Sequence, residues 1–126
     1  SAFPRIPRSQ GARRHGVFAD GAYVPIFQIP PQYPRRAAER GIEGCVVVEY
    51  TVTTMGTVRD PEVIAANPSG IFNSSAKRAA LKYKYKPMIR DGVAVEVPGV
   101  KQRITFILEG EGKGPDYIPQ NCLEMY

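Results

Sequence analysis

The sequence predicts an α+β fold, in which a three-stranded antiparallel sheet with the strand order second, first, third carries two helices on one face. Three observations support this fold class. Residues 43–53 are rich in valine and threonine, which is typical of a strand. Residues 73–85 place apolar side chains at helical spacing. Residues 100–108 form another strand-like run near the end of the chain.

Length and composition predict one domain with an extension on each side. A chain of 126 residues can bury one modest core. We expect a flexible basic linker over residues 1–22, a folded domain over residues 23–109, and a glycine-rich tail over residues 110–126 that either folds back on the sheet or frays. The sequence has no apolar run of about 18 residues, so membrane anchoring would need a segment absent from this chain.

The folded domain is predicted to begin with an extended segment and a short helix. Residues 23–34 contain four prolines, which disfavour both a helix and a central strand. Pro34 suits the first turn of a helix that runs to Arg40, and Gly41 is a typical helix stop. A helix of this length is unstable alone, so packing must hold it.

The next elements form a predicted β-hairpin. The strand over residues 43–53 is expected to turn at Gly56 and return over residues 58–66. Pro61 lies inside the second strand, and this places that strand at an edge of the sheet or marks a bulge.

A second helix and a last strand complete the predicted domain. Asn73 is the expected N-cap of a helix that runs to Tyr85. Turns at Asp91-Gly92 and Pro98-Gly99 flank a short strand over residues 93–97, and the strand over residues 100–108 follows.

The connections predict the order of the strands. A hairpin makes the first two strands antiparallel, and a right-handed crossover through the second helix returns the third strand parallel to the second. The third strand then lies beside the first, so the first is central and residues 100–108 form a sheet edge. An exposed edge offers its backbone to another chain.

Charge and residue types narrow the function classes. Residues 1–40 hold seven arginines against two acidic residues, whereas residues 41–126 hold ten basic and ten acidic residues. The arginine-rich arm could bind nucleic acid, anionic lipid or an acidic partner, or could be a solvated tether. The sequence predicts neither a catalytic set nor a metal site, because it contains one histidine, His15, and two cysteines without CxxC spacing. No cofactor is expected.

An ordered set of short segments carries a resemblance to a known family. The segments are Pro31-Gln32-Tyr33-Pro34, Gly41-Ile42-Glu43-Gly44, Val46 to Val52, Gly56-Thr57-Val58, Pro68 to Phe72, Tyr83-Lys84-Tyr85-Lys86-Pro87 and Ile104 to Leu108. Together they resemble the C-terminal periplasmic domain of TonB-type energy transducers, over roughly residues 25 to 109. Two residues depart from the family's pattern, because Pro30 stands where family members often have glutamine and Tyr83 stands where they frequently have tryptophan.

The resemblance implies a periplasmic binding domain of a protein that is anchored in the bacterial inner membrane, and not an enzyme. Such domains engage the TonB box of outer-membrane receptors by strand addition. They transmit energy from the proton-motive force, through ExbB and ExbD, for the uptake of siderophores, haem or cobalamin. A homodimer is compatible with the sequence, and nucleic acid is not an expected partner. A basic nucleic-acid-binding domain that uses the arginine-rich arm is the alternative.

The resemblance also implies site residues. The receptor-proximal segment would be Pro31, Gln32, Tyr33 and Pro34. The receptor strand would pair with the last strand, namely Val100, Lys101, Gln102, Arg103, Ile104, Thr105, Phe106, Ile107 and Leu108.

The two cysteines could form a disulfide. Cys45 lies on the sheet face opposite Val46 and Val48, a face that the helices should leave uncovered. If the tail folds over that face, Cys122 could reach Cys45, and the oxidising periplasm would permit the bond. Two free thiols are the alternative.

Overall fold

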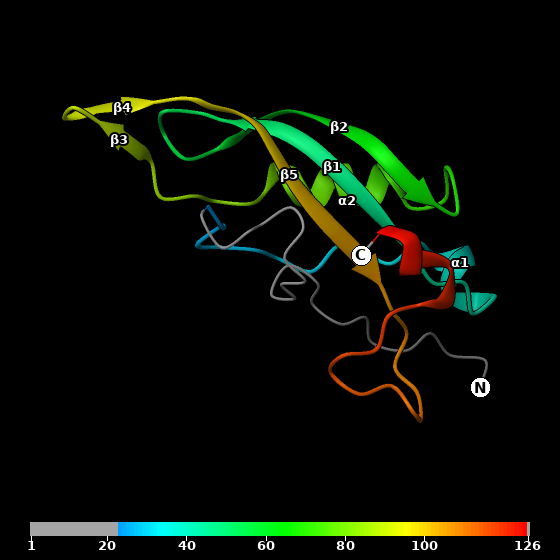
Figure 1. Ribbon diagram of the computed structural model, residues 1–126. Coiled ribbons are helices and arrows are strands. Elements are labelled where there is room, and N and C mark those ends of the chain that lie inside the picture. Colours follow the sequence, from blue (N-terminus) through cyan, green and yellow to red (C-terminus); the bar gives the residue numbers. More distant parts are fainter. Residues whose placement is uncertain (1–22, 126) are drawn as a thin grey trace.

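The structure is a computed structural model that describes residues 23–125. The predicted basic linker and His15 lie outside these residues. In chain order, the elements are α1 (Arg35–Glu39), β1 (Gly44–Val52), β2 (Val58–Asn67), α2 (Asn73–Leu81), β3 (Met88–Arg90), β4 (Val93–Val95), β5 (Val97–Phe106) and the 3-10 helix η1 (Gln120–Met125) (Figure 1).

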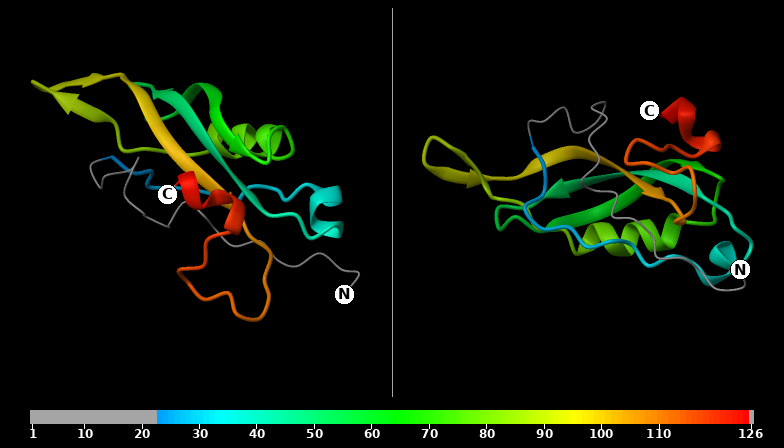
Figure 2. Two further views of the ribbon diagram at one scale, coloured as in Figure 1. Left: turned by 45° about the vertical axis from the view of Figure 1, so that its right-hand side comes forward. Right: turned by 90° about the horizontal axis from the view of Figure 1, so that it is seen from below.

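The main sheet has three strands in the order β2-β1-β5, and β1 is antiparallel to both of its neighbours. This confirms the predicted strand order and the central place of the first strand. Helix α2 lies against one face of the sheet, and η1 lies on the opposite side (Figure 2, right). The fold is therefore the predicted α+β arrangement, with β5 at one end of the sheet order.

The core lies between the sheet and α2. Every second residue of β1, from Val46 to Val52, is buried on the helix side, as the pleat of a strand requires. The rings of Phe72 and Phe106 stack there with centroids 4.3 Å apart. Each fully buried large side chain contributes about 1.5–3 kcal/mol to folding. The small side chains Ala76, Ala79 and Ala80 let α2 approach the sheet closely.

Short helix α1 depends on this core. Pro34 occupies the N-cap with φ −61° and ψ 132°, and Gly41 follows the helix with φ 71°, a conformation that favours glycine. Ala37 and Ala38 are buried against the rest of the domain. Five residues cannot form a stable helix alone, so these contacts hold α1 in place.

Strand β2 shows both features that Pro61 predicted. It lies at the other end of the sheet order, and its register against β1 shifts between Glu49 and Thr51. Asp60, directly before the proline, has φ 55°. The missing N–H of proline therefore falls where the ladder is already interrupted by a bulge.

Helix α2 corrects two predictions. The N-cap is Phe72 rather than Asn73, and the Oδ1 atom of Asn73 is buried without a hydrogen-bond partner among residues 23–125. The helix ends at Leu81 rather than Tyr85. It stops early because the backbone of Lys84 bonds to Phe27 instead, with Lys84 N donating to Phe27 O over 3.0 Å.

The last strand differs from its prediction at both ends. β5 starts at Val97, and the expected turn at Pro98-Gly99 is instead a bulge inside the strand, where the register against β1 shifts. β5 ends at Phe106, so Ile107 and Leu108 follow the strand rather than belong to it.

An additional hairpin projects from one end of the sheet (Figure 1). Its strands β3 and β4 pair antiparallel, with Met88 opposite Val95, and the Asp91-Gly92 turn joins them. Both turn residues have positive φ, 53° and 79°, as a tight hairpin turn requires. The turn was predicted correctly, but the strand over residues 88–90 was not.

Candidate protein-binding site

The strand proposed to pair with a receptor, β5, directs its side chains into two packed layers. Ile104 and Phe106 enter the core on the helix side, whereas Arg103 and Thr105 are buried on the outer side. Lys101 lies 3.6 Å from Glu49 of β1. Because these side chains are already engaged, a partner that adds to β5 would be held through backbone groups. Of the nine predicted pairing residues, the seven from Val100 to Phe106 lie in β5.

The predicted receptor-proximal segment lies beside the end of β5. The ring of Tyr33 packs edge-on against Phe72 and Phe106, with centroid distances of 5.6 and 5.7 Å. The Tyr33 hydroxyl donates to the Ile42 carbonyl over 2.6 Å. Burial is the main cause that raises the pKa of Tyr33 above its ordinary value, so this hydroxyl stays protonated. Tyr33 thus braces the core next to β5.

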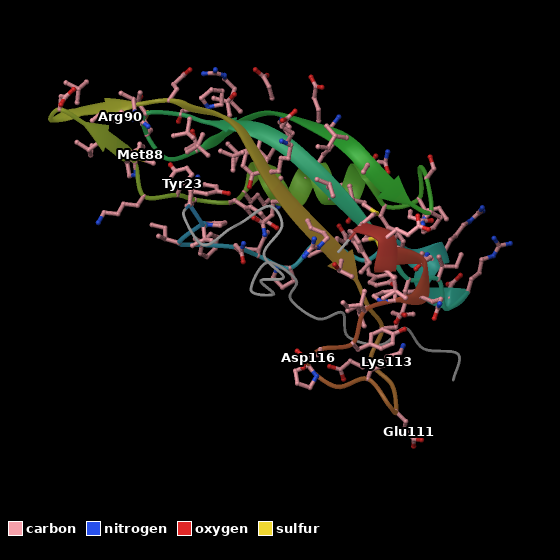
Figure 3. All side chains as sticks on the ribbon, in the orientation of Figure 1. Tyr23, Met88, Arg90, Glu111, Lys113 and Asp116 are labelled. Atoms are coloured by element: carbon pink, nitrogen blue, oxygen red, sulfur yellow. A yellow bond between two sulfur atoms is a disulfide. The ribbon has the colours of Figure 1, made fainter. Side chains whose placement is uncertain are left out.

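A largely buried carboxylate, Glu43, organises the chain directly after β5, and it was not among the site residues predicted from the sequence. Glu43 accepts hydrogen bonds from Leu108 N at 2.8 Å, Lys113 Nζ at 2.6 Å and the Tyr117 hydroxyl at 2.7 Å. Lys113 lies in the loop that follows β5, where Figure 3 labels it. In the sequence, Glu43 is an acidic residue directly before a buried strand, within the Gly41-Ile42-Glu43-Gly44 segment of the family resemblance, and neither feature indicates its partners in the tail.

The Glu43 cluster is largely shielded from water. The side chains of Lys113 and Glu43 are 21% and 12% exposed. Lys113 also donates to the Leu108 carbonyl at 2.9 Å and lies 5.2 Å from the ring centroid of Tyr117. Burial and the hydrogen bond to the negative Glu43 raise the pKa of Tyr117 to about 12. The cluster therefore ties the loop after β5 to the start of β1.

The C-terminal tail covers the outer face of the sheet. Cys45 and Cys122 form a disulfide, with both residues fully buried and their Cα atoms 6.0 Å apart. Asn121 Nδ2 donates to the Glu43 carbonyl at 3.0 Å, and Arg103 donates to the Met125 carbonyl at 2.9 Å. The tail is thus clamped across β1, on the face opposite α2 (Figure 2, right).

Comparison with known proteins identifies the family. The family described as "Gram-negative bacterial TonB protein C-terminal" matches residues 29–108. The chain belongs to the TonB C-terminal family.

Relatives and solved structures agree with this assignment. Protein TonB of Pseudomonas aeruginosa is 36% identical over 80 residues, which cover 64% of this chain and 23% of that protein. Protein TonB of Vibrio cholerae is 32% identical over 102 residues, covering 81% of this chain and 41% of the relative. The chain therefore spans less than half the length of these relatives.

Two solved TonB structures share the fold. The TonB2 protein of Vibrio anguillarum aligns with a TM-score of 0.54 and 34% identity, covering 87% of this chain and 93% of that chain. The solution NMR structure of the Pseudomonas aeruginosa TonB C-terminal domain aligns with a TM-score of 0.51 and 31% identity, covering 76% and 94%.

The clamped tail lies outside the part of the chain that matches the TonB family, which ends at residue 108. The tail's contacts with the family domain include Glu43, directly before β1, Cys45 in β1 and Arg103 in β5. Within residues 23–125, no group of three or more metal-binding side chains gathers, and no helix is long and apolar enough to cross a bilayer.

Replacing Glu43 with glutamine is expected to loosen the tail and to lower the free energy of unfolding by about 2 kcal/mol. Three hydrogen bonds lose their charged acceptor, and bonds to charged groups contribute about 1.5–3 kcal/mol each before compensation by the new amide. Urea unfolding of the disulfide-bonded protein measures this change. The matched control is Glu49→Gln, because Glu49 makes one exposed ion pair. This substitution should lower the free energy of unfolding by at most about 1 kcal/mol. Equal losses in the two variants would contradict the role given to Glu43.

Proposed function

We propose that this TonB-family domain binds the TonB box of outer-membrane receptors by strand addition to β5, and that it transmits a pulling force to the bound receptor. The single observation that carries the proposal is the position of β5 at one end of the sheet order β2-β1-β5 in a domain of the TonB C-terminal family. The domain acts in the periplasm as a binding module rather than an enzyme.

Backbone recognition suits this task. A receptor segment that adds to β5 gains main-chain hydrogen bonds at alternate residues, each contributing about 0.5–1.5 kcal/mol. The buried side chains of β5, such as Ile104 and Thr105, leave little room for side-chain readout. The domain can therefore bind receptors whose TonB boxes differ in sequence.

The sheet offers a direct route for force. The chain enters the sheet at Gly44, the first residue of the central strand β1. β1 and β5 are joined over eight paired positions, from Gly44 opposite Phe106 to Val52 opposite Val97. A load applied through the residues before β1 is then shared among these pairs before it reaches a receptor strand on β5.

The remaining parts of the proposed function concern the whole protein. A segment outside this chain anchors it in the inner membrane, where ExbB and ExbD couple it to the proton-motive force. The driven process is the uptake of siderophores, haem or cobalamin through TonB-dependent receptors. These steps rest on the family to which the domain belongs.

A titration with N-methylated peptides tests the strand addition. A synthetic TonB-box peptide is compared by calorimetry with two N-methylated versions. One version is methylated at three alternate residues, and the other at the three residues that lie between or next to them. Because successive N–H groups of a strand point to opposite sides, only one of the two versions loses its hydrogen bonds to β5. Losing three bonds of about 1 kcal/mol each should weaken the binding of that version roughly 100-fold. The other methylated version should bind nearly as well as the parent peptide.

The same titration addresses the alternative function. Duplex DNA is titrated in parallel at equal salt, because an arginine-rich arm would bind it with a strong salt dependence. The proposal predicts that the peptide binds more tightly than the DNA. Equal binding of the two methylated peptides, together with tighter binding of DNA, would overturn the proposal.

A further inference from the structure

A groove of about 220 Å³ runs between α2 and the extended segment that precedes α1. The groove exists because α2 contributes small side chains, Ser75 and Ala79, where larger ones would fill it. Ser75 also donates a hydrogen bond to the Gln32 carbonyl, which fixes the extended segment at this distance from the helix. The lining residues are Ile29, Pro30, Pro31, Gln32, Ser75, Arg78, Ala79 and Lys82.

The two sides of the groove differ in chemistry. Ile29 and Pro30 present apolar surface, and neither Pro30 nor the buried Pro31 has an N–H group to satisfy. The opposite side carries the exposed cations Arg78, in α2, and Lys82, the C-cap residue directly after it. They lie four residues apart and therefore point the same way. One ligand could thus bury an apolar group against Ile29 and Pro30 while it presents negative charge to Arg78 and Lys82.

The cations of the groove, Arg78 and Lys82, make no ion pair with any residue in the 23–125 range. Helix α2 contains no acidic residue, and the single acidic residue of α1, Glu39, is paired with Arg35 at 3.4 Å. The electrostatic potential at the groove is therefore positive, which favours an anionic ligand.

We propose that this groove is a second binding site, which takes an acidic peptide segment of a partner protein. An aspartate or glutamate of the peptide pairs with Arg78, whose planar guanidinium suits a carboxylate, and Lys82 binds a second carboxylate. An apolar side chain of the peptide packs on Ile29 and Pro30. A simple anion such as phosphate would leave this apolar wall unused, so a peptide fits the whole groove better.

The site does not depend on strand addition at β5. Binding at the groove uses side chains of α2, whereas strand addition uses the backbone of β5. A partner could therefore bind the groove even if the proposed receptor function failed. Two lining residues, Pro31 and Gln32, belong to the predicted receptor-proximal segment, whereas Arg78 and Lys82 lie outside it. The double variant Arg78→Gln with Lys82→Gln should therefore leave TonB-box peptide binding unchanged.

The test compares two double variants of equal charge. The probe is a fluorescein-labelled peptide with the sequence Leu-Asp-Glu-Leu-Asp-Glu, measured by fluorescence anisotropy at low salt. Arg78→Gln with Lys82→Gln should weaken binding about tenfold, which corresponds to losing about 1.4 kcal/mol. Lys77→Gln with Arg36→Gln is the matched control, because these exposed residues carry the same charge but do not line the groove. It should weaken binding less than twofold.

Two further measurements complete the test. The peptide with asparagine and glutamine in place of its acidic residues should not bind, and amide NMR shifts should map the acidic peptide to residues 29–32 and 75–82. Equal loss in both double variants, or shifts confined to β5, would overturn the proposal. Displacement of the peptide by inorganic phosphate at equal affinity would also overturn it, because it would show a simple anion site.

Discussion

Replacing both Cys45 and Cys122 with alanine should lower the free energy of unfolding by about 4.5 kcal/mol. The disulfide closes a loop with a sequence separation of 77 residues, which encloses nearly the whole sheet and α2. For a loop of this length, the entropy removed from the unfolded chain corresponds to about 4.5 kcal/mol at 25 °C. A domain of this size has a total stability of about 5–15 kcal/mol, so the bond supplies a large share.

Guanidinium unfolding measures this loss, and it has an internal control. The native sequence unfolded in the presence of a reductant should lose the same free energy as the double alanine variant, because both lack the covalent loop. The single variant Cys122→Ala should behave likewise. If the free energies of unfolding of the oxidised and reduced protein differ by less than about 1 kcal/mol, the conclusion that the disulfide clamps the tail is wrong.

Replacing Gly56 with alanine should have the second-largest effect, a loss of about 4 kcal/mol. Gly56 has φ 83°, and an added Cβ atom would lie 2.1 Å from the Tyr85 carbonyl oxygen. Gly56 also accepts a hydrogen bond from Tyr85 N at 2.8 Å, so the two segments cannot separate without losing it. Positive φ costs a non-glycine residue about 1–2 kcal/mol, and overpacking adds about 1–3 kcal/mol.

Gly92 provides the matched control for this substitution. Its φ is 79°, nearly the value at Gly56, but an added Cβ atom would meet nothing within 4 Å. Gly92→Ala should therefore cost only the backbone strain, about 1–2 kcal/mol. Thermal and urea unfolding of the two variants distinguish the cost of backbone strain from the cost of the clash with Tyr85. If both substitutions lower the free energy of unfolding equally, the close approach between the β1–β2 turn and Tyr85 is not important for stability.

The sequence predicted the parts of the fold that local patterns determine. The alternation of β1, the glycine at the following turn and the apolar spacing of α2 are visible in a few residues each. Once the hairpin and the right-handed crossover were recognised, the order β2-β1-β5 followed from connection rules.

The features that the sequence did not predict depend on long-range contacts. The early end of α2 results from pairing between Lys84 and Phe27, which are far apart in the chain. The role of Glu43 requires Lys113 and Tyr117, about 70 residues further on. The bulge at Pro98-Gly99 resembles a turn in the sequence, because proline and glycine favour both structures.

The candidate site was predictable to the same extent. The strand that ends the sheet followed from topology, whereas Tyr33 was assigned to the receptor-proximal segment only through the resemblance to the TonB family. The groove beside α2 could not be predicted, since it depends on the distance between two segments about 45 residues apart in sequence. In a sequence, a small residue such as Ala79 indicates that a helix packs closely on its neighbours, and it does not indicate that a groove forms beside the helix.

The most direct test of the proposed receptor contact is amide hydrogen exchange along β5, measured by NMR on the isotope-labelled chain with and without a synthetic TonB-box peptide. Strand addition predicts that the peptide slows exchange at alternate residues between Val100 and Phe106, and that cross-strand contacts appear between peptide and β5 protons. Unchanged exchange along β5 under saturating peptide, with protection only elsewhere in the domain, would contradict the assignment of β5 as the receptor-binding strand.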